Sequence, residues 1–517
     1  MTPIESAISE PARTAYLIPE YADSISVTLE KPANSLGTLP GIHPENLGDP
    51  SMREVHGTTF PYIAGEMANG IATVEMVEAV AHQGMLGFFG AAGLSLPEIE
   101  KALVRLERSC AGLPWGSNLI HSPQDQELEE KTVDLYLAHG VKRVSASAFM
   151  GVRPSIVRYA YKGIHTAPDG SIVRPNHVFA KISRPEVARQ FLAPAPAAML
   201  QTLVEKGGLT REEATLAAIL PVAEDYTVEA DSGGHTDNRP LVALLPTIMT
   251  VRDEIAAKYN YDRPIRVGCG GGLGTPAAVA AAFSLGAAYV MIGSVNQCTR
   301  ESGQCEHTKK LLSQAGLADV MMAPAGDMFE LGVKVQVLKR GTLFGMRAIK
   351  LWELYNRHES LETLPAPIAH TLEKDIFKKP VLQVWEETRQ YFLKRKPEEV
   401  ERGEKDPKHR MALVFRWYLG QSSRWSITGD KARTMDYQIW CGPAMGAFNE
   451  WAAGSFLEDP ANRGVAEIAL NLMHGAASIT RAQQFRASGV NVPSRLFHYS
   501  PKPLLESAGR LSHAQAI

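Results

Sequence analysis

Eight short apolar segments, bounded by glycine or proline and separated by helical patterns, constrain this fold most strongly. They are PYIAGEM from Pro61, MLGFFGA from Met85, WGSNLI from Trp115, VKRVSASAF from Val141, HVFAKI from His177, DYTVEAD from Asp225, IRVGCGG from Ile265 and AYVMIGS from Ala288. Most are continuously apolar, which is typical of parallel strands buried on both faces. Alternating strands and helices fit either an open doubly wound sheet or a closed barrel. Eight units in about 250 residues favour the closed (β/α)8 TIM barrel.

Helical patterns with recognisable ends lie between most of these strands. They cover residues 72–83, 96–110, 124–139, 239–259 and 275–285. Ser95 is the expected N-cap of the second helix, with Pro97 in its first turn. Gly140 is the expected glycine after the third helix, and Thr275 is the expected N-cap of the fifth.

Glycines cluster after the seventh and eighth predicted strands, where barrels often bind phosphate. Gly270, Gly271 and Gly272 follow the seventh strand, and Gly293 and Ser294 follow the eighth. Bare backbone can approach an anion there, and the helix that follows adds a favourable dipole. The alternative is that these glycines only make tight turns. A dinucleotide-binding GxGxxG belongs after the first strand, so the pattern predicts a mononucleotide phosphate held by a barrel.

Polar side chains stand at the ends of three other predicted strands. His235 follows Gly233 and Gly234 after the sixth strand, where imidazole can give or take a proton near neutral pH. Asn118 ends the third strand and Lys181 lies near the end of the fifth. The alternatives are a solvated loop histidine and a lysine on the barrel rim.

Small residues follow the first strand, and no metal motif is present. Ala64 and Gly65 allow a flat ligand to lie against the backbone, although packing or turn formation explains them equally. The chain contains no HExxH, EF-hand loop, Walker A or GxSxG sequence. Its 5 cysteines form no CxxC pair, so no metal site is expected. Cys269 fits a small buried thiol better than a nucleophile.

Charge and hydropathy exclude two classes of partner. Lys and Arg total 53 against 56 Asp and Glu, a net charge of −3, so no global basic field for nucleic acid exists. Residues 273–295 carry no charge, but they are rich in Ala, Gly and Ser and divide into a helix and a strand. We therefore expect no membrane span. The first 20 residues lack a signal-peptide pattern, so a cytoplasmic location is expected.

Several of these motifs together resemble a known family. The order IAGEMA, GSNLI, VEADSGGHTDNRP, VGCGGGLGTP and VMIGSVNQCTRESG looks like the FMN-dependent nitronate monooxygenase and enoyl-ACP reductase superfamily. The stretches from Gly326 and from Tyr418 look like its PfaD-type trans-acting enoyl reductases of polyunsaturated fatty acid and polyketide synthases. The resemblance covers roughly residues 50 to 495.

The resemblance implies a role for each matching residue. The family's catalytic histidine matches His235, and its flavin-contacting asparagine matches Asn118. The backbone facing the isoalloxazine matches Ala64 and Gly65. The phosphate cradle matches Gly271, Gly272, Gly293 and Ser294, although a cysteine in the seventh loop departs from the family pattern. Glu229 lies where relatives often have a polar residue near the ribityl chain or phosphate.

The resemblance also implies a reaction and a partner. FMN reduced by NADPH would give hydride to a trans-2-enoyl thioester held on an acyl carrier protein, with His235 supplying or positioning the proton. Basic clusters in residues 378–410 are one docking candidate, but acidic residues interleave with them. The group of Lys334, Lys339, Arg340 and Arg347 is an equal candidate. The rivals are a nitronate monooxygenase and a non-catalytic synthase scaffold, and a homodimer is possible.

The pattern changes to helices from about Met328. We therefore predict an N-terminal arm (1–50), an FMN-binding barrel (51–327) and a mainly helical C-terminal cap or substrate domain (328–517). Helices are expected over residues 342–355, 380–396, 407–419 and 465–488. Aromatic residues cluster between Phe415 and Trp451. They fit an ordinary domain core or, alternatively, the lining of an acyl tunnel.

Overall fold

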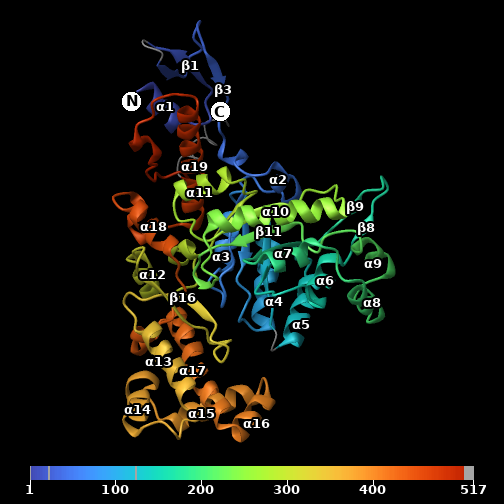
Figure 1. Cartoon of the computed structure of the whole chain (residues 1–517), viewed down its shortest axis with the longest axis vertical. Coiled ribbons are helices and arrows are strands. Elements are labelled where there is room, and N and C mark those ends of the chain that lie inside the picture. The colour runs from blue at the N-terminus through green and yellow to red at the C-terminus, as the bar shows by residue number, and fades with distance from the viewer. Residues whose placement is uncertain (1, 21–23, 123–124, 506–517) are drawn as a thin grey trace. The chain divides into compact units, whose positions relative to one another are not determined.

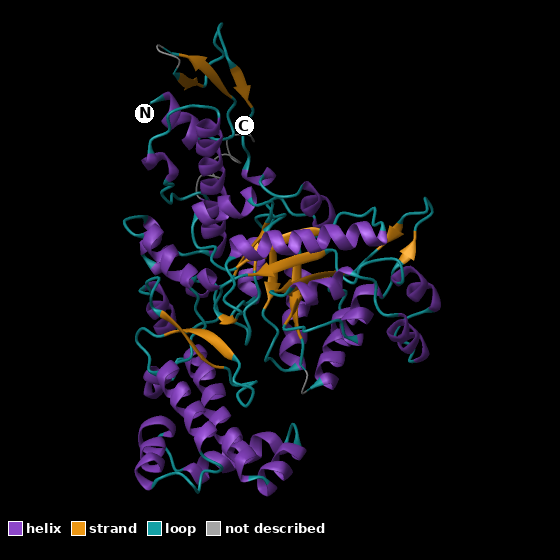
Figure 2. Ribbon diagram, viewed as in Figure 1, coloured by secondary structure: helices purple, strands orange, loops and turns teal. Residues whose placement is uncertain are grey.

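Eight parallel strands form a closed barrel, as the sequence predicts (Figures 1 and 2). The computed structural model describes residues 2–20, 24–122 and 125–505. The barrel strands are β4 (Tyr62–Ala64), β5 (Leu86–Phe89), β6 (Trp115–Ile120), β7 (Arg143–Ser147), β10 (His177–Ile182), β11 (Asp225–Glu229), β13 (Arg266–Gly270) and β14 (Val290–Ile292). Each predicted segment contains one of them, so the predicted barrel is confirmed.

The pairing of the strands brings the predicted loops to one end of the barrel. β14 closes the ring by pairing with β4, with Ile292 opposite Ala64. On its other side β14 pairs with β13, with Met291 opposite Gly270. Because all eight strands are parallel, their carboxyl ends lie at the same face. The glycine turns after β13 and β14 are therefore neighbours of each other and of Gly65.

Aromatic side chains fill the barrel interior. Phe88, Phe179 and Tyr289 are fully buried, with ring centroids 5.2 Å apart between the two phenylalanines and 5.6 Å apart between Phe179 and Tyr289. Gly268 leaves room for them, because a Cβ there would stand 2.4 Å from the Tyr289 ring. The barrel is thus a packed core, and a ligand must bind at one of its ends.

Helices surround the strands (Figure 2). They are α3 (Val74–Ala81), α4 (Leu96–Ser109), α5 (Gln126–Ala138), α6 (Pro154–Tyr161), α7 (Pro185–Leu192), α8 (Ala197–Glu205), α9 (Arg211–Ala217), α10 (Leu241–Tyr259) and α11 (Pro276–Ser284). β8 (His165–Thr166) and β9 (Ile172–Val173) form a hairpin before β10. The expected start of the third helix, Gln124, lies outside the described residues.

The predicted helix ends are confirmed by the backbone. Ser95 N donates to the Glu98 carboxylate at 2.8 Å at the start of α4. Thr275 Oγ1 accepts from Ala278 N at 3.3 Å at the start of α11. Gly140 follows α5 with φ of 57°, the left-handed conformation that favours glycine. The uncharged stretch 273–295 is thus α11 and β14, and no helix among the described residues is long and apolar enough to cross a membrane.

The helix that completes the barrel comes from the end of the chain. α19 (Val465–Ala487) packs against both α11 and α3, the place of the helix that should follow β14 (Figure 1). The approach to α11 is close, since a Cβ at Gly475 would lie 2.7 Å from Pro276. The sequence predicts this helix but assigns it to the C-terminal domain. The structure places it on the barrel instead.

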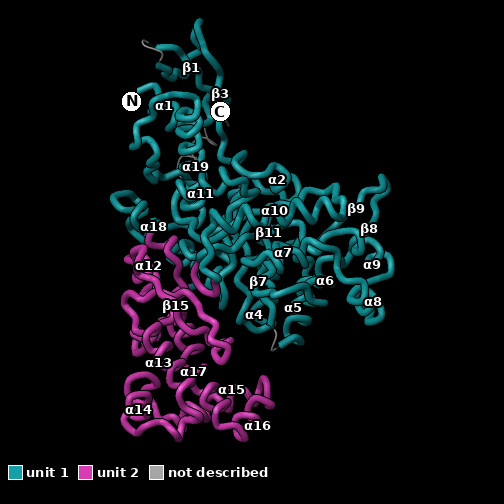
Figure 3. Tube along the Cα trace, in the orientation of Figure 1, with its two compact units in different colours: residues 1–231, 237–303, 447–517 teal, residues 232–236, 304–446 magenta. Residues whose placement is uncertain are grey.

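Two compact units result from this return of the chain (Figure 3). We call residues 1–231, 237–303 and 447–517 the barrel unit, and residues 232–236 and 304–446 the inserted unit. The inserted unit therefore lies in the sequence between β14 and α19, the helix that completes the barrel. These limits differ from the predicted domain boundaries near residues 50 and 327, since the end of the chain groups with the barrel.

The described part of the N-terminal arm is folded and packs on α19. It contains α1 (Pro3–Ser9), a three-stranded sheet of β1 (Ala15–Pro19), β2 (Ile25–Thr28) and β3 (Gly37–Leu39), and then α2 (Pro50–His56). Arg481 of α19 is fully buried and donates to the carbonyls of Pro11, Arg13 and Pro40 at 2.7, 3.0 and 2.7 Å. One guanidinium thus joins both ends of the arm to the last barrel helix.

The inserted unit has its own sheet, helices and core. β12 (Gly234–His235), β16 (Lys334–Leu338) and β15 (Val320–Pro324) form an antiparallel sheet. The helices are α12 (Glu306–Ser313), α13 (Phe344–Arg357), α14 (Ala366–Thr371), η4 (Leu372–Phe377), α15 (Val381–Leu393), α16 (Pro397–Lys405), α17 (Pro407–Thr428) and η5 (Lys431–Asp436). Phe415 and Tyr418 are fully buried in its core, and Trp417, Trp425 and Trp440 pack against it. These aromatic residues are core residues.

Candidate active site

A half-buried lysine and two glutamates meet at the carboxyl end of the barrel strands. Lys181 on β10 places its Nζ 3.1 Å from Glu229 Oε1 at the end of β11 and 3.2 Å from Glu66 Oε1 after β4. Burial by itself would lower the pKa of Lys181, but the charges of Glu229 and Glu66 raise it above its ordinary value. Lys181 is therefore a fixed cation. The sequence predicts Lys181 and Glu229 as site residues, and the structure brings them together.

Glu66 is the member of this group that sequence reasoning missed. Its side chain is only 4% exposed; Oε1 faces Lys181 Nζ, and Oε2 has no hydrogen-bond donor among the described residues. The ion pair with Lys181 compensates its charge in part, since that lysine also neutralises Glu229. A buried carboxylate with unfilled acceptor positions is costly. The available sequence signal was a charged residue within the small-residue turn IAGEMA at a barrel strand end.

Asn118 is held in place by hydrogen bonds to the next strand. Its Nδ2 donates to Ser145 O at 3.0 Å and to Ser147 Oγ at 2.9 Å, and the residue is 3% exposed. Both amide hydrogens are thus used by β7. Oδ1 is the polar atom of the side chain that remains to receive a donor from a ligand. The strand continues to Ile120, beyond the end predicted at Asn118.

The glycines of the two predicted loops divide into two kinds. Gly271 has φ of 92°, and a Cβ there would lie 2.7 Å from Ala230 O, so this glycine is required by the turn. Gly272 and Gly293 have no heavy atom within 4 Å of such a Cβ. Open space beside bare backbone, on loops from adjacent strands, is what a phosphate cradle provides. Ser294 begins the short helix η3 (Ser294–Cys298) directly after Gly293.

Gly65 and Gly270 serve close approach between strands. A Cβ at Gly65 would lie 2.9 Å from the Met291 side chain, and Gly65 N donates to Ile292 O at 2.9 Å. A Cβ at Gly270 would lie 3.1 Å from Met291 O. Ala64 is 2% exposed. The predicted positions thus lie at the correct barrel face, and their packing accounts for the lack of larger side chains.

His235 belongs to the inserted unit. After Asp231 the chain leaves the barrel unit for residues 232–236, and Gly234 and His235 form β12 against Gln336 and Val335 of β16. Gly234 has φ of 84°, which favours glycine at this turn. Gly233 is also enclosed, since a Cβ at Gly442 would lie 2.8 Å from its nitrogen. The Gly-Gly pair thus shapes the loop that carries the histidine.

An aspartate that sequence reasoning missed is the partner of His235. His235 Nε2 lies 3.2 Å from Asp327 Oδ1, and the two side chains are 46% and 58% exposed. Burial would raise the pKa of Asp327, but the hydrogen bond and charge of His235 lower it below its ordinary value. A carboxylate on one ring nitrogen fixes the tautomer, and the other nitrogen, Nδ1, can then exchange a proton. The 92 residues between the two gave no local signal.

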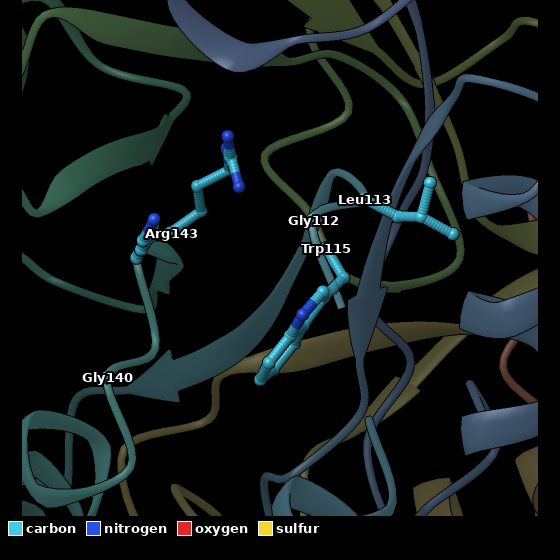
Figure 4. A pocket seen from close by; sticks show the side chains of 6 residues that line it. Gly112, Leu113, Trp115, Gly140 and Arg143 are labelled. Atoms are coloured by element: carbon cyan, nitrogen blue, oxygen red, sulfur yellow. The ribbon is translucent and has the colours of Figure 1, made fainter. Parts of the chain in front are cut away.

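A small cavity of about 140 Å³ opens at the opposite, amino-terminal end of the strands (Figure 4). It is lined by Gly112, Leu113, Trp115, Gly140, Lys142 and Arg143. These residues begin β6 and β7 or directly precede them. Active sites of such barrels lie at the carboxyl ends of the strands, so we do not assign the catalytic site to this cavity.

Three potential metal ligands also meet at that amino-terminal end. Ligand atoms of His56, His177 and Asp225 lie within 4.8 Å of one another. Arg266 already engages both oxygens of Asp225, with Nε at 2.5 Å and Nη2 at 3.0 Å. Arg143 Nη2 donates to His56 O at 2.8 Å. Two guanidinium groups beside the cluster oppose a metal cation, so it is an ion-pair network.

Glycine turns after the last two strands and the lysine–carboxylate cluster lie at the same face of the barrel. This is the face at which barrels of this kind bind their ligands. The chain belongs to the nitronate monooxygenase family, whose model matches residues 49–374. Residues 358–437 match a second model, the inserted helical domain of [acyl-carrier-protein] S-malonyltransferase. This second match lies within the inserted unit.

Relatives of this chain come from two kinds of biosynthetic protein. It is 44% identical to polyketide biosynthesis protein PksE of Bacillus subtilis over 474 residues, covering 92% of this chain and 61% of that protein. It is 44% identical to a polyunsaturated fatty acid synthase polypeptide of a Thraustochytrium species over 449 residues, covering 85% of this chain and 30% of that one. The chain therefore spans less than two thirds of either relative.

A solved structure matches both units. The enoyl reductase domain of MlnA, from the macrolactin biosynthesis cluster of Bacillus amyloliquefaciens, aligns with a TM-score of 0.82 and 37% identity. The alignment covers 86% of this chain and 99% of that domain. The similarity thus extends beyond the barrel.

Proposed function

We propose that this protein is an FMN-dependent enoyl reductase that uses NADPH to reduce trans-2-enoyl thioesters carried on an acyl carrier protein. One observation carries the proposal. The match to an enoyl reductase domain covers 99% of that domain, whereas the nitronate monooxygenase model ends at residue 374. The helices after that residue are a feature that the chain shares with the enoyl reductase domain and that a small nitronate does not require.

The residues at the carboxyl end of the barrel fit FMN. The phosphate would bind beside Gly272 and Gly293, because open space adjoins their backbone on adjacent loops. Glu66 Oε2 is buried and lacks a hydrogen-bond donor among the described residues, and a ribityl chain carries hydroxyl donors. Lys181 and Asn118 add a fixed cation and an oriented amide. The donor set therefore suits a phosphorylated ligand with both donors and acceptors.

The chain's own residues would bind, orient and exchange a proton. When bound, FMN supplies hydride transfer, taking two electrons from NADPH and delivering them to Cβ of the enoyl thioester. Cα must then receive one proton. His235 would provide it at Nδ1, while Asp327 holds Nε2 and stabilises the charged imidazolium. Lys181 remains protonated throughout and keeps the charge at the barrel end constant.

Turnover with paired substrates tests the proposal. The purified protein should be yellow, and FMN released by denaturation should approach one equivalent. Under air it should oxidise NADPH with crotonyl-N-acetylcysteamine and form the butyryl product, with little turnover of an alkyl nitronate. The opposite preference would establish the rival, a nitronate monooxygenase, which the family model favours. Purification without FMN and without FMN affinity would favour the scaffold alternative.

The histidine–aspartate pair can be tested separately. His235→Ala should retain FMN but lower crotonyl thioester turnover by about 100-fold or more, the usual contribution of a general acid. Asp327→Asn acts through His235, so kcat should fall less and its pH profile should shift. Unchanged turnover in His235→Ala would remove the histidine from the mechanism. A normal pH profile in Asp327→Asn would make the aspartate structural only.

A further inference from the structure

Three exposed apolar side chains gather at the start of α13 in the inserted unit. Leu343, Met346 and Met435 are 42%, 64% and 44% exposed. Leu343 and Met346 are three residues apart, which puts them on one helix face. Leu343 N donates to Met435 O at 2.8 Å, so η5 places its methionine beside them. Exposed methionine and leucine side chains brought together from two segments mark an interaction surface rather than scattered surface residues.

Basic side chains surround these three residues. Lys339, Arg340, Lys350 and Lys431 are exposed, and the Lys378 side chain is 40% exposed. Lys350 lies one helical turn beyond Met346 on the same face. Lys378 Nζ donates to Ala432 O at 2.7 Å, which brings it to η5. We call Lys339, Arg340, Leu343, Met346, Lys350, Lys378, Lys431 and Met435 the basic–apolar patch.

Two carboxylates beside the patch, Asp319 and Asp436, are paired with basic side chains. Asp319 accepts from Arg340 at 3.4 Å. The Asp436 side chain is fully buried, where Arg347 and Arg433 pair with it and Lys378 Nζ lies 3.6 Å away. Tyr418 OH also donates to Asp436 at 2.9 Å. These two carboxylates thus do not oppose the exposed lysines of the patch, and the Asp436 network connects α13, α17 and η5.

A second exposed region of the same unit differs in charge. Tyr391 and Leu393 at the end of α15 are 50% and 43% exposed, and Arg395 lies over the Tyr391 ring at 4.1 Å. The next helix, α16, supplies interleaved carboxylates, two of which pair with Arg389 and His409. Lysines and glutamates, and therefore charges of both signs, thus cover this region. It serves as a matched control, because it offers similar exposure without a uniform charge.

We propose that the basic–apolar patch docks an acidic acyl carrier protein. The inference rests on the proposed function, because it names the surface through which the carrier-linked substrate is delivered. Carrier proteins are usually acidic, so charge complementarity would steer encounter while the three apolar side chains pack against the bound helix. Lys378, Lys431 and Met435 also lie in the segment that matches the helical insertion of a carrier-protein acyltransferase. Of the two docking candidates in the sequence, the structure supports part of the Lys334–Arg347 group together with Lys378.

Paired substrates test the patch on the full-length FMN-loaded protein. The test variants are Lys339→Glu with Lys350→Glu, and Met346→Glu alone. The control is Lys394→Glu with Arg395→Glu, which changes the same number of charges directly after α15. Each is assayed with crotonyl-N-acetylcysteamine and with crotonyl loaded on an acidic acyl carrier protein, at low and high salt. Binding of the carrier protein alone is measured by calorimetry.

We expect both test variants to raise KM for the carrier-linked substrate by about tenfold or more, with unchanged kinetics on the small thioester. The salt dependence of KM should weaken in the double lysine variant. The control should match the parent protein. Equal effects of test and control variants would overturn the proposal, and so would equal losses on both substrates.

Two other results would also count against the patch. If the parent protein reduces neither thioester, the proposed function fails, and calorimetry then decides docking on its own. Carrier binding that is indifferent to Lys339→Glu with Lys350→Glu would reject the patch. If Met346→Glu instead converts a dimer to a monomer in sedimentation without changing carrier KM, the patch is a self-association surface.

Discussion

The two ends of the barrel each hold a buried group of charges, but their charges are balanced differently. At the amino-terminal end both Asp225 oxygens are engaged by Arg266, and Oδ1 also lies 3.1 Å from His56 Nε2. At the carboxyl end one lysine pairs with two glutamates, and Glu66 Oε2 lacks a donor among the described residues. We therefore expect the amino-terminal group to matter for folding and the carboxyl-terminal group to matter for ligand binding.

The electrostatics of Asp225 support this contrast. Burial opposes its ionisation, but the charges and hydrogen bonds of Arg266 and His56 hold its pKa well below the usual range. Burial likewise lowers the pKa of His56, which outweighs the opposing effect of Asp225. His56 is thus neutral near pH 7, donating from Nε2 to Asp225 and accepting from Arg143 at Nδ1 at 3.4 Å. Asp225, His56 and Arg266 thus pair with one another.

The largest effect is expected at Asp225. Asp225→Ala leaves Arg266 buried and unpaired, which should lower the free energy of unfolding by about 3–5 kcal/mol in urea titration. The Asp237→Ala control breaks the more exposed pair with Arg184 and should cost about 1 kcal/mol or less. If Asp225→Ala does not fold, Asp225→Leu with Arg266→Met should restore a folded barrel. A stability loss equal to the control would contradict the structural role of this end.

Lys181 should matter for ligand binding more than for folding. Lys181→Met leaves Glu66 and Glu229 facing each other without a cation, so FMN affinity should fall by about 10- to 100-fold. Flavin fluorescence titration measures this directly. Lys162→Met is the control. Lys162 Nζ lies 3.3 Å from Glu213 Oε2, and this ion pair is away from the carboxyl ends of the barrel strands. If both variants bind FMN equally well, the lysine is not part of the cofactor site.

Glu66 tests the comparison most directly. Glu66→Gln keeps the shape but removes one acceptor and the buried negative charge. We expect apoprotein stability to be unchanged or higher, and FMN affinity to be about tenfold weaker. Urea titration of the apoprotein and fluorescence titration give the two values. A marked loss of apoprotein stability instead would mean that both ends of the barrel are structural networks.

The strands were predictable because each carries its own local pattern, whereas long-range partners were not. Segments such as HVFAKI and IRVGCGG are apolar over most of their six or seven residues, which indicates a buried strand. The sequence therefore predicted β10 and β13 directly. α19 was predicted as a helix, but its place beside α11 depends on a return of the chain after the inserted unit. Asp327 was missed for the same reason. No local pattern encodes which distant segment completes a barrel or meets a histidine.

Candidate site residues show the same limit on a smaller scale. Glycine clusters predicted the turns after β13 and β14. Only the structure distinguishes Gly272, which adjoins open space, from Gly271, which the turn itself requires. Glu66 was overlooked because a glutamate in sequence gives no sign of burial. The structure makes it a candidate because its side chain is 4% exposed and its Oε2 has no donor among the described residues.

The smallest expected effect is a pH dependence at the amino-terminal end. Burial, and then the neighbouring His56, hold the pKa of His177 well below its ordinary value, with Arg174 and Arg143 acting in the same direction and Asp225 opposing them. In the unfolded chain a histidine side chain has a pKa of about 6.5. As pH falls below that value the unfolded state binds a proton that the folded state does not, so stability falls with decreasing pH.

His177→Phe should therefore flatten the loss of stability between about pH 6.5 and 5. One proton fewer corresponds to about 1.4 kcal/mol per pH unit. The change also removes Nδ1, a buried nitrogen without a hydrogen-bond partner among the described residues, and leaves a ring beside His56, whose centroid is 5.0 Å away. Urea titrations at several pH values give the slope, with the exposed His165→Phe as control. If the free energy of unfolding changes with pH at the same slope in the parent and in His177→Phe, this end of the barrel binds protons when folded. The contrast between its charges and those around Lys181 would then be lost.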